Sequence, residues 1–495
     1  MGIVLNQTFK NTFVSYIGLI IGYVNIILLY PAYFSIVEFG IISLLTSISF
    51  VYSQLSAIGI ENTFLKFFPS FKTDDKHHNG FITFSIIVIL IGFSVVTLFY
   101  ILFKPLIVES FIEKSPLFLN YYFWLIPLSF FILVFNILES ISRAIYKTVI
   151  SVFLKEVLFR ILITIGIILV GFKVISFEYF VYFYVLIHSL IFLILFIYIY
   201  RLKEYKFWSS KNTLNKKNYK ELFNYGVFSF LAFSSYYISL NVDRIMLGSM
   251  VGLEMVGIFQ LFVFVTTVIG FPTRALTKIS VPVISDCWQK NNVSEIFNIY
   301  FKSTINLFII SSFIFICIIT NFDNLIKILN KPEFNDTFFI LLFLGLSFLI
   351  DATGGVNSDI LSTSKKYKFD SLFNVSYLVA GILLNLIFIP LYQGVGAAIA
   401  TALSILIVNI IKWNFIRRNF KMQPFNFFHF KILCIACIVF ILGFILPKME
   451  NFLLDAIYRC ITISILYFTL IISLKISEDI NEKFYKILAR VGIKK

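Results

Sequence analysis

The sequence predicts an all-α polytopic membrane protein with about 14 transmembrane helices, grouped as six, six and a terminal pair. Three observations predict this fold class. Hydrophobic residues make up 59% and charged residues 14% of the 495 residues, whereas soluble globular chains are about 25% charged. Apolar stretches of about 20 residues, the length that crosses a bilayer as a helix, recur along the whole chain. Lysine and arginine also alternate between rich and poor loops.

The predicted spans form two groups of six, separated by the longest polar linker, Arg201 to Asn224. In chain order they are Asn11–Phe34, Gly40–Asn62, Phe81–Phe103, Pro116–Leu138, Ile150–Gly171, Glu178–Tyr200, Tyr225–Leu247, Val256–Leu276, Ser303–Thr320, Thr337–Asn357, Ser371–Leu391, Val395–Phe415, Lys431–Leu446 and Phe452–Leu474. We therefore expect an N-terminal lobe over residues 1–208, a C-terminal lobe over 209–420, and a terminal helix pair with a tail over 421–495.

The positive charges predict which ends of the spans face the cytoplasm. When the N-terminus, every second loop and the C-terminus are assigned to one side together with the span ends next to them, that side holds 32 of the 41 lysines and arginines. The opposite loops hold seven, and Arg160 and Arg459 lie inside spans. Because short cytoplasmic loops are enriched in lysine and arginine, this partition predicts an even number of spans and two cytoplasmic termini. The opposite loops are short, so we expect the activity to lie within the bilayer.

A hairpin of two apolar helices occurs twice in the sequence. The clearer copy covers residues 225–286 and a fainter copy covers residues 30–69, each with a glycine-bearing turn. The matched turn residues are Glu38 with Glu254 and Gly40 with Gly257. An internal repeat of roughly half the chain is a common construction in secondary transporters.

The sequence lacks the motifs of several catalytic classes. It has no Gly-rich loop ending in Gly-Lys-Ser/Thr, which argues against ATP hydrolysis, and no Gly-x-Ser-x-Gly elbow. The four histidines lack metal-ligand spacing, and His77 and His78 are expected to be solvated in a polar loop. We therefore expect no enzyme activity, no metal and no cofactor. The net charge of +15 follows from the loop cations of a membrane protein, so no nucleic-acid partner is expected.

Two basic residues are the first candidates for a substrate site. A charge at the bilayer centre costs about 2.5–3.5 kcal/mol on insertion scales, so each charge within a span calls for a reason. Arg274 and Lys278 lie four residues apart and hence on one helix face, between Pro272 and Pro282. A guanidinium fork beside an ammonium can hold a phosphate or diphosphate. The alternative is that both are ordinary cytoplasmic-side cations.

Other charged residues are candidates for ion coupling or for structure. Glu61, Asp351 and Asp243 are the carboxylates that we consider for coupling to a proton or sodium ion. Asp243 and its neighbour Arg244 point to different sides of a helix, and each has the alternative of pairing with another span. Arg459 is expected to extend its side chain to the membrane interface at the start of the last span.

One segment carries a family resemblance. It reads Asn385-Leu-Ile-Phe-Ile-Pro390-Leu-Tyr-Gln-Gly394-Val-Gly396-Ala397-Ala398-Ile-Ala400-Thr401. It resembles the connection between spans eleven and twelve in the multidrug/oligosaccharidyl-lipid/polysaccharide (MOP) exporter superfamily, with the glycines here compressed to Gly394-x-Gly396. Residues 355–361, with Lys365, Lys366 and Lys368 after them, resemble the tenth span and its basic inner loop. Within the superfamily, the chain is most similar to the oligosaccharide (O-antigen type) flippases.

The resemblance implies two pseudo-symmetric six-helix lobes around a central cavity that opens alternately to each side. It implies a lipid-linked oligosaccharide as substrate, typically on a polyprenyl diphosphate, and a bacterial cytoplasmic membrane as location. The cationic cavity of the family agrees with a substrate-binding role for Arg244, Arg274 and Lys278. Expected partners are this substrate, membrane lipids, a coupling proton or sodium ion, and the polysaccharide polymerase and glycosyltransferases of the same process.

Three alternatives stay open. A cation-coupled multidrug exporter of the same fold would have an apolar cavity with one or two isolated carboxylates. A membrane-embedded sugar polymerase or ligase is disfavoured because such enzymes generally need a large extracytoplasmic loop. A scaffold for polysaccharide enzymes would retain its role when the cavity is inactivated by mutation.

Overall fold

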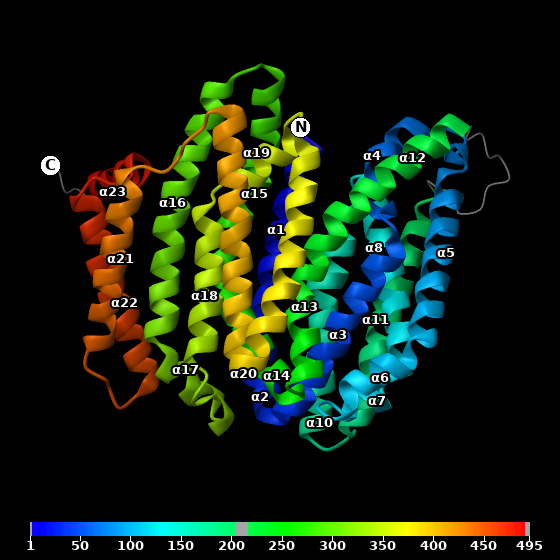
Figure 1. The fold of residues 1–495 in the computed structure, drawn as a ribbon, viewed down its shortest axis with the longest axis horizontal. Helices are drawn as coiled ribbons and strands as arrows, with labels where there is room; N and C mark the ends of the chain where they lie inside the picture. The colour runs from blue at the N-terminus through cyan, green and yellow to red at the C-terminus, as the bar shows by residue number, and fades with distance from the viewer. Residues whose placement is uncertain (1, 204–215, 491–495) are drawn as a thin grey trace. The chain divides into compact units, whose positions relative to one another are not determined.

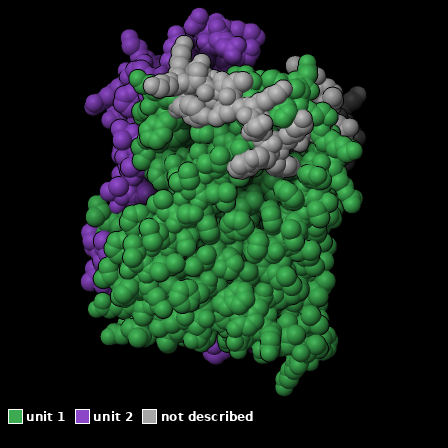
Figure 2. Space-filling model, turned by 90° about the vertical axis from the view of Figure 1, so that its right-hand side faces the viewer, with its two compact units in different colours: residues 1–261, 381–383 green, residues 262–380, 384–495 purple. Residues whose placement is uncertain are grey.

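The structure is a computed structural model that describes residues 2–203 and 216–490 (Figure 1). Helices are the only regular elements within these ranges. The chain divides into two compact units, which Figure 2 distinguishes by colour: unit 1 comprises residues 1–261 and 381–383, and unit 2 comprises residues 262–380 and 384–495. The predicted lobe boundary at residue 208 lies outside the described residues, so the predicted lobes stay a prediction.

Unit 1 carries the helices from α1 into α14. They are α1 (Gly2–Tyr23), α2 (Tyr30–Tyr33), α3 (Ile36–Ala57), α4 (Ile60–Phe71), α5 (Phe81–Leu102), α6 (Lys104–Ile112), α7 (Leu117–Asn120), α8 (Leu125–Ala144), α9 (Val149–Phe153), α10 (Phe159–Gly171), α11 (Phe177–Arg201), α12 (Lys216–Ser229), α13 (Ser235–Met250) and α14 (Leu253–Thr266, up to Leu261). Short π-helical segments join some of them, at Val24–Leu29, Leu154–Leu158 and Phe230–Ser234, and 3₁₀ turns lie at His78–Gly80 and Tyr122–Trp124.

Unit 2 carries the remaining helices. They are α15 (Phe271–Gln289), α16 (Val293–Thr320), α17 (Phe322–Leu329), α18 (Phe338–Thr353), α19 (Asn357–Thr363), α20 (Tyr367–Phe420, apart from residues 381–383), α21 (Phe427–Ile445), α22 (Phe452–Ser473) and α23 (Glu478–Arg490). Its 3₁₀ turns lie at Thr267–Gly270 and Pro332–Phe334. The all-α polytopic fold class is therefore confirmed.

The predicted count of fourteen spans is not confirmed. Among the described residues, ten helices are long and apolar enough to cross a membrane, or eleven if the bent pair α18 and α19 counts as one span. Three predicted spans, Asn11–Phe34, Ile150–Gly171 and Tyr225–Leu247, contain π-helical segments. The first of them is still among the ten that are long and apolar enough. Two others join in the single helix α20, which contains one non-helical residue at Gln393 (φ 50°, ψ −124°).

The turn predicted from the family-like segment lies at this break. Gln393 takes a left-handed φ, three residues after Pro390 within α20. A Cβ atom on Gly396 would lie 2.0 Å from the carbonyl oxygen of Phe388. The chain can approach itself this closely only where a side chain is missing, which explains why a glycine stands at this position.

The two copies of the hairpin meet in unit 1. A Cβ atom on Gly40 of α3 would lie 1.9 Å from the carbonyl oxygen of Leu253, and one on Gly257 of α14 would lie 2.5 Å from that of Ile36. The first turn of α3 is fixed by a capping box in which Ser35 and Glu38 bond reciprocally, with a Ser35 N to Glu38 Oε2 distance of 2.7 Å. The matched glycines therefore form a close helix contact, as small residues do in membrane bundles.

The loop between α4 and α5 corrects one prediction. His78 is buried, accepts a hydrogen bond at Nδ1 from the Thr73 N–H group (3.1 Å), and packs edge-on against Phe68 (5.2 Å between ring centroids). The expectation that His78 is solvated was therefore wrong. The imidazole closes the loop over the aromatic core of unit 1, where Phe64, Phe68 and Phe81 stack.

Candidate functional site

Charged side chains form one cluster within unit 1, centred on Glu139 of α8. The buried Glu139 carboxylate accepts from Arg143 Nη2 (2.5 Å), one turn later on the same helix, and from Lys155 Nζ (3.1 Å) in the π-helical segment Leu154–Leu158. Glu61 on α4 lies within electrostatic range of all three groups. Its Oε1 atom is buried, with no donor within hydrogen-bond distance in the described part of the chain. The cluster therefore balances two cations with two carboxylates and leaves one carboxylate oxygen unsatisfied.

Replacement of Glu139 tests this cluster. We expect Glu139→Ala to destabilise the protein by about 1–3 kcal/mol, because Arg143 and Lys155 lose their shared partner, and the cost is limited because both cations are about half exposed. The measurement is the thermal midpoint in detergent, followed by size-exclusion chromatography. Glu482→Gln, in the exposed pair with Lys486 on α23, is the control and should leave the midpoint nearly unchanged. An equal midpoint for Glu139→Ala and wild type would contradict the assignment.

Arg244 and Asp243 lie next to each other on α13, but their surroundings differ. The Asp243 side chain is buried. Arg244 donates from Nη1 to Gln260 Oε1 (2.5 Å) and from Nη2 to Asn241 Oδ1 (3.0 Å), and Nη2 also reaches the Leu240 carbonyl. These three acceptors are neutral and fix the guanidinium in place, and the neighbouring Asp243 lies within electrostatic range of it. Fixed cations of this kind are suited to binding anions.

Arg274 and Lys278 are exposed on α15 in unit 2. The Arg274 guanidinium lies 5.8 Å from the ring centroid of Phe271 and within electrostatic range of Asp351. No carboxylate lies within ion-pair distance of either cation among the residues that the structure describes, whereas Lys290 at the end of α15 pairs with Asp286 at 2.6 Å. The two candidate residues therefore present available positive charge.

Asp351 lies near a break between two helices of unit 2. Helices α18 and α19 are bent by 52° around Gly354–Val356, where Gly355 has a φ of +59° and its missing Cβ leaves room for Ser303 Oγ. Asp351 is exposed, and it lies within electrostatic range of Lys412 as well as Arg274. Discontinuous helices of this kind line substrate and ion sites in many transporters.

Sequence reasoning missed several polar residues beside this break. Asn357 Nδ2 donates to Asn409 Oδ1 (3.0 Å), and the buried Asp359 accepts from Ser280 Oγ (2.5 Å). The buried Lys412 reaches Asp370 Oδ1 (3.3 Å) and Ser358 Oγ (2.9 Å). The Gly354-Gly355 pair was the available signal, because consecutive glycines within an apolar helix favour a break.

Two basic residues inside spans are held by carboxylates of their own helices. Arg160 pairs with Glu156 at 2.8 Å. Arg459 is 3% exposed and pairs with Asp455 at 2.7 Å, and its guanidinium also donates to the carbonyls of Gly443 and Leu446. The expectation that Arg459 extends to the interface was therefore wrong. Its guanidinium fixes the hairpin of α21 and α22 instead.

These features define an integral membrane protein whose helical units contain polar centres. Residues 4–288 match the model of the family described as "Polysaccharide biosynthesis protein", so the chain belongs to that family. The capsular polysaccharide biosynthesis protein CapF of Staphylococcus aureus is 27% identical over 203 residues, which cover 38% of this chain. The matched part spans about half (48%) of the length of that relative.

Solved structures show the same fold. The lipid II flippase MurJ, in an inward closed conformation, has a TM-score of 0.73 at 15% identity and covers 94% of this chain and 99% of its own. An inward-facing multidrug resistance MATE family transporter of the MOP superfamily has a TM-score of 0.66 at 14% identity, covering 79% of this chain and 92% of its own. These likenesses show that the chain shares the fold of both transporters.

Proposed function

We propose that this protein is a flippase that moves a lipid-linked oligosaccharide, carried on a polyprenyl diphosphate, across the bacterial cytoplasmic membrane for surface polysaccharide synthesis. The observation that carries the proposal is the exposed pair of cations Arg274 and Lys278, which have no carboxylate within ion-pair distance in the described ranges. A diphosphate is the anion that a guanidinium and an ammonium one helical turn apart would bind. Arg244 of unit 1, held by three neutral acceptors, is a further candidate for binding an anion.

The chain would act as a transporter rather than as an enzyme. In the proposed mechanism the lobes 1–208 and 209–420 rock to alternate access, and residues 421–495 form an added helix pair with a tail. Both termini would lie in the cytoplasm. The polymerase and glycosyltransferases of the same process would be its partners.

A proton or sodium ion would drive the cycle. Glu61 is the strongest of the three coupling candidates because its buried Oε1 has no hydrogen-bond donor among the described residues, so a proton can be taken up there. Asp351, exposed beside the broken helix and close to Arg274, would sense the bound anion. Asp243 is buried next to Arg244 and would hold that cation's charge in balance.

A second candidate function is cation-coupled export of a drug-like cation. The same unsatisfied carboxylate oxygen of Glu61 favours it, because a carboxylate oxygen without a donor attracts cations. The cations Arg244, Arg274 and Lys278 oppose it by repulsion.

The double variant Arg274→Ala/Lys278→Ala tests the flippase proposal in cells. We expect lipid-linked precursor to accumulate on the cytoplasmic side and surface polysaccharide to fall by about tenfold or more. The reason is that a loss of about 1.4 kcal/mol in the free energy of anion binding weakens the affinity by about a factor of ten. Precursor is measured by lipid extraction and surface polysaccharide by immunoblotting. Lys290→Ala, which removes a paired cation of the same helix, should behave as wild type. Unchanged surface polysaccharide in the double variant, at normal protein levels, would refute the role of these residues.

A further inference from the structure

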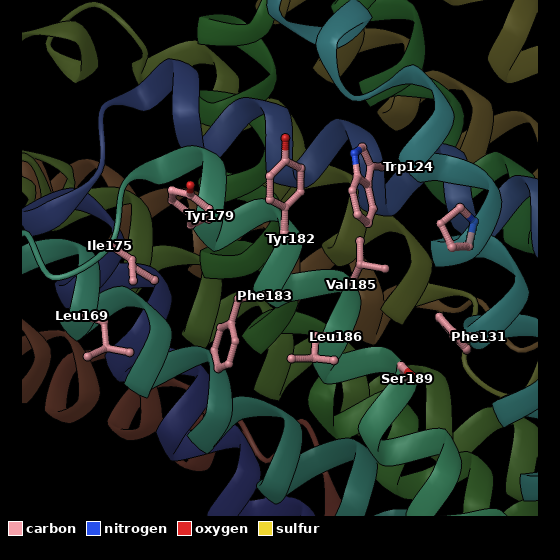
Figure 3. A pocket seen from close by; sticks show the side chains of 11 residues that line it. Trp124, Phe131, Leu169, Ile175, Tyr179, Tyr182, Phe183, Val185, Leu186 and Ser189 are labelled. Carbon is pink, nitrogen blue, oxygen red and sulfur yellow. The ribbon is translucent and has the colours of Figure 1, made fainter.

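A groove of about 620 Å³ opens on unit 1 between α8, α10 and α11 (Figure 3). Its walls are apolar along most of its length, with Phe131 from α8, Leu169 from α10, and Phe183 and Leu186 from α11. The volume lies within the range of about 300–1,000 Å³ that is usual for small-molecule sites. None of the charged residues proposed for transport lines this groove.

The groove has one polar end. There Trp124, Tyr182 and Tyr179 stand side by side in Figure 3, with ring centroids 4.6 Å apart for Trp124 and Tyr182 and 6.2 Å apart for Tyr179 and Tyr182. The Tyr182 hydroxyl donates to Glu178 Oε1 at 2.6 Å. Tryptophan and tyrosine concentrate at the headgroup level of a bilayer. The groove therefore has the polarity of a lipid, with a polar end and an apolar body.

The helix beside the groove presents an apolar face. Leu186, Leu190, Leu193 and Ile197 of α11 are all exposed, at the spacing of one helix face. In an integral membrane protein such a face is covered by hydrocarbon chains. A groove beside such a face is open to the hydrocarbon chain of a lipid.

An acidic side chain lies at the polar end. Glu178 accepts the hydrogen bond of Tyr182, which lines the groove, and Glu178 and Glu38 both lie within electrostatic range of Tyr121. A carboxylate at this end favours a headgroup that carries a positive charge, whereas a diphosphate would be repelled by the carboxylates.

We propose that this groove binds a zwitterionic aminophospholipid. One acyl chain lies between Phe131, Phe183 and Leu186. The lipid ammonium meets the Glu178 carboxylate and the faces of Trp124 and Tyr182, which attract a cation. The predicted topology assigns this end to the extracytoplasmic leaflet. The proposal is independent of the transported substrate.

Fluorescence of Trp124 tests the proposal. The full chain with Trp208→Phe, Trp288→Phe and Trp413→Phe keeps Trp124 as its single tryptophan. It is reconstituted in vesicles of equal parts phosphatidylethanolamine and phosphatidylglycerol, with brominated chains on one lipid at a time. We expect stronger quenching when phosphatidylethanolamine is brominated. Glu178→Gln should abolish this difference, and Ser189→Phe, which fills the groove, should reduce quenching by both lipids.

Leu193→Phe is the matched control, because it enlarges an exposed residue of α11 that does not line the groove. It should quench as the parent does. Equal quenching by the two brominated lipids in the parent protein would overturn the proposal. Loss of quenching when a few mole per cent of unbrominated polyprenyl diphosphate is added would also overturn it, because the groove would then hold the carrier lipid.

Discussion

Gly40→Leu is expected to prevent stable folding of the protein. The Cβ atom alone would lie 1.9 Å from the Leu253 carbonyl oxygen, a backbone atom that a rotamer change cannot move away. Overpacking a well-packed contact typically costs about 1–3 kcal/mol and more where the backbone must shift, and this site is at or beyond the upper end of that range. The measurement is the yield of monodisperse protein after membrane extraction, together with its thermal midpoint.

Gly40→Ala and Gly257→Ala should lower the midpoint in the same direction, since a Cβ on Gly257 would lie 2.5 Å from the Ile36 carbonyl oxygen. Gly226→Ala is the matched control in unit 1, because the nearest atom to its Cβ would be 3.6 Å away, at ordinary contact distance. Alanine variants at 40 and 257 that are as stable as Gly226→Ala would show that the two hairpin turns do not meet closely.

Arg459→Met is expected to destabilise the terminal hairpin by about 3–5 kcal/mol, the usual cost of breaking a buried ion pair by removing one partner. Both side chains of the pair are about 4% exposed. The change also removes the donor to the Gly443 and Leu446 carbonyls near the end of α21. Asp455 would keep Asn324 Nδ2 (2.6 Å) and the Met449 N–H group (2.8 Å) as partners, which limits the loss.

Limited proteolysis of α21 and α22, followed by mass spectrometry, measures this effect alongside the thermal midpoint. Lys448→Ala is the control, because it removes an exposed partner of Asp323 in the same region and should have little effect. If Arg459→Met and Lys448→Ala unfold at the same temperature, then the guanidinium does not support the hairpin.

The membrane class and the all-α fold could be predicted from the sequence because each depends on local or periodic information. Apolar runs predict spans directly. Gly40 and Gly257 were matched by aligning the two hairpins in the sequence. In the structure both glycines lie in the contact between α3 and α14. The break in α20 between Pro390 and Gly396 was likewise predictable, because proline and glycine mark turns in the local sequence.

The pairing of Lys155 with Glu139 could not be predicted, because the two residues are 16 positions apart and meet only in the fold. Asp455 lies four residues before Arg459 on one helix, so the sequence spacing already allowed this pair. The contact of Arg459 with the carbonyls at the end of α21 is shown only by the fold. The count of fourteen spans is not confirmed, since ten or eleven segments of the described residues are long and apolar enough to cross a membrane.

The most direct test of the proposed function is transport by the purified full chain in liposomes. A fluorescent polyprenyl-diphosphate oligosaccharide is placed in one leaflet, and its appearance in the other is followed by a membrane-impermeant quencher. We predict that the protein accelerates transfer under an ion gradient and that Arg274→Ala/Lys278→Ala removes most of this acceleration while Lys290→Ala does not. Correctly folded protein that leaves the oligosaccharide lipid in its original leaflet, yet exports a cationic dye, would contradict the flippase proposal.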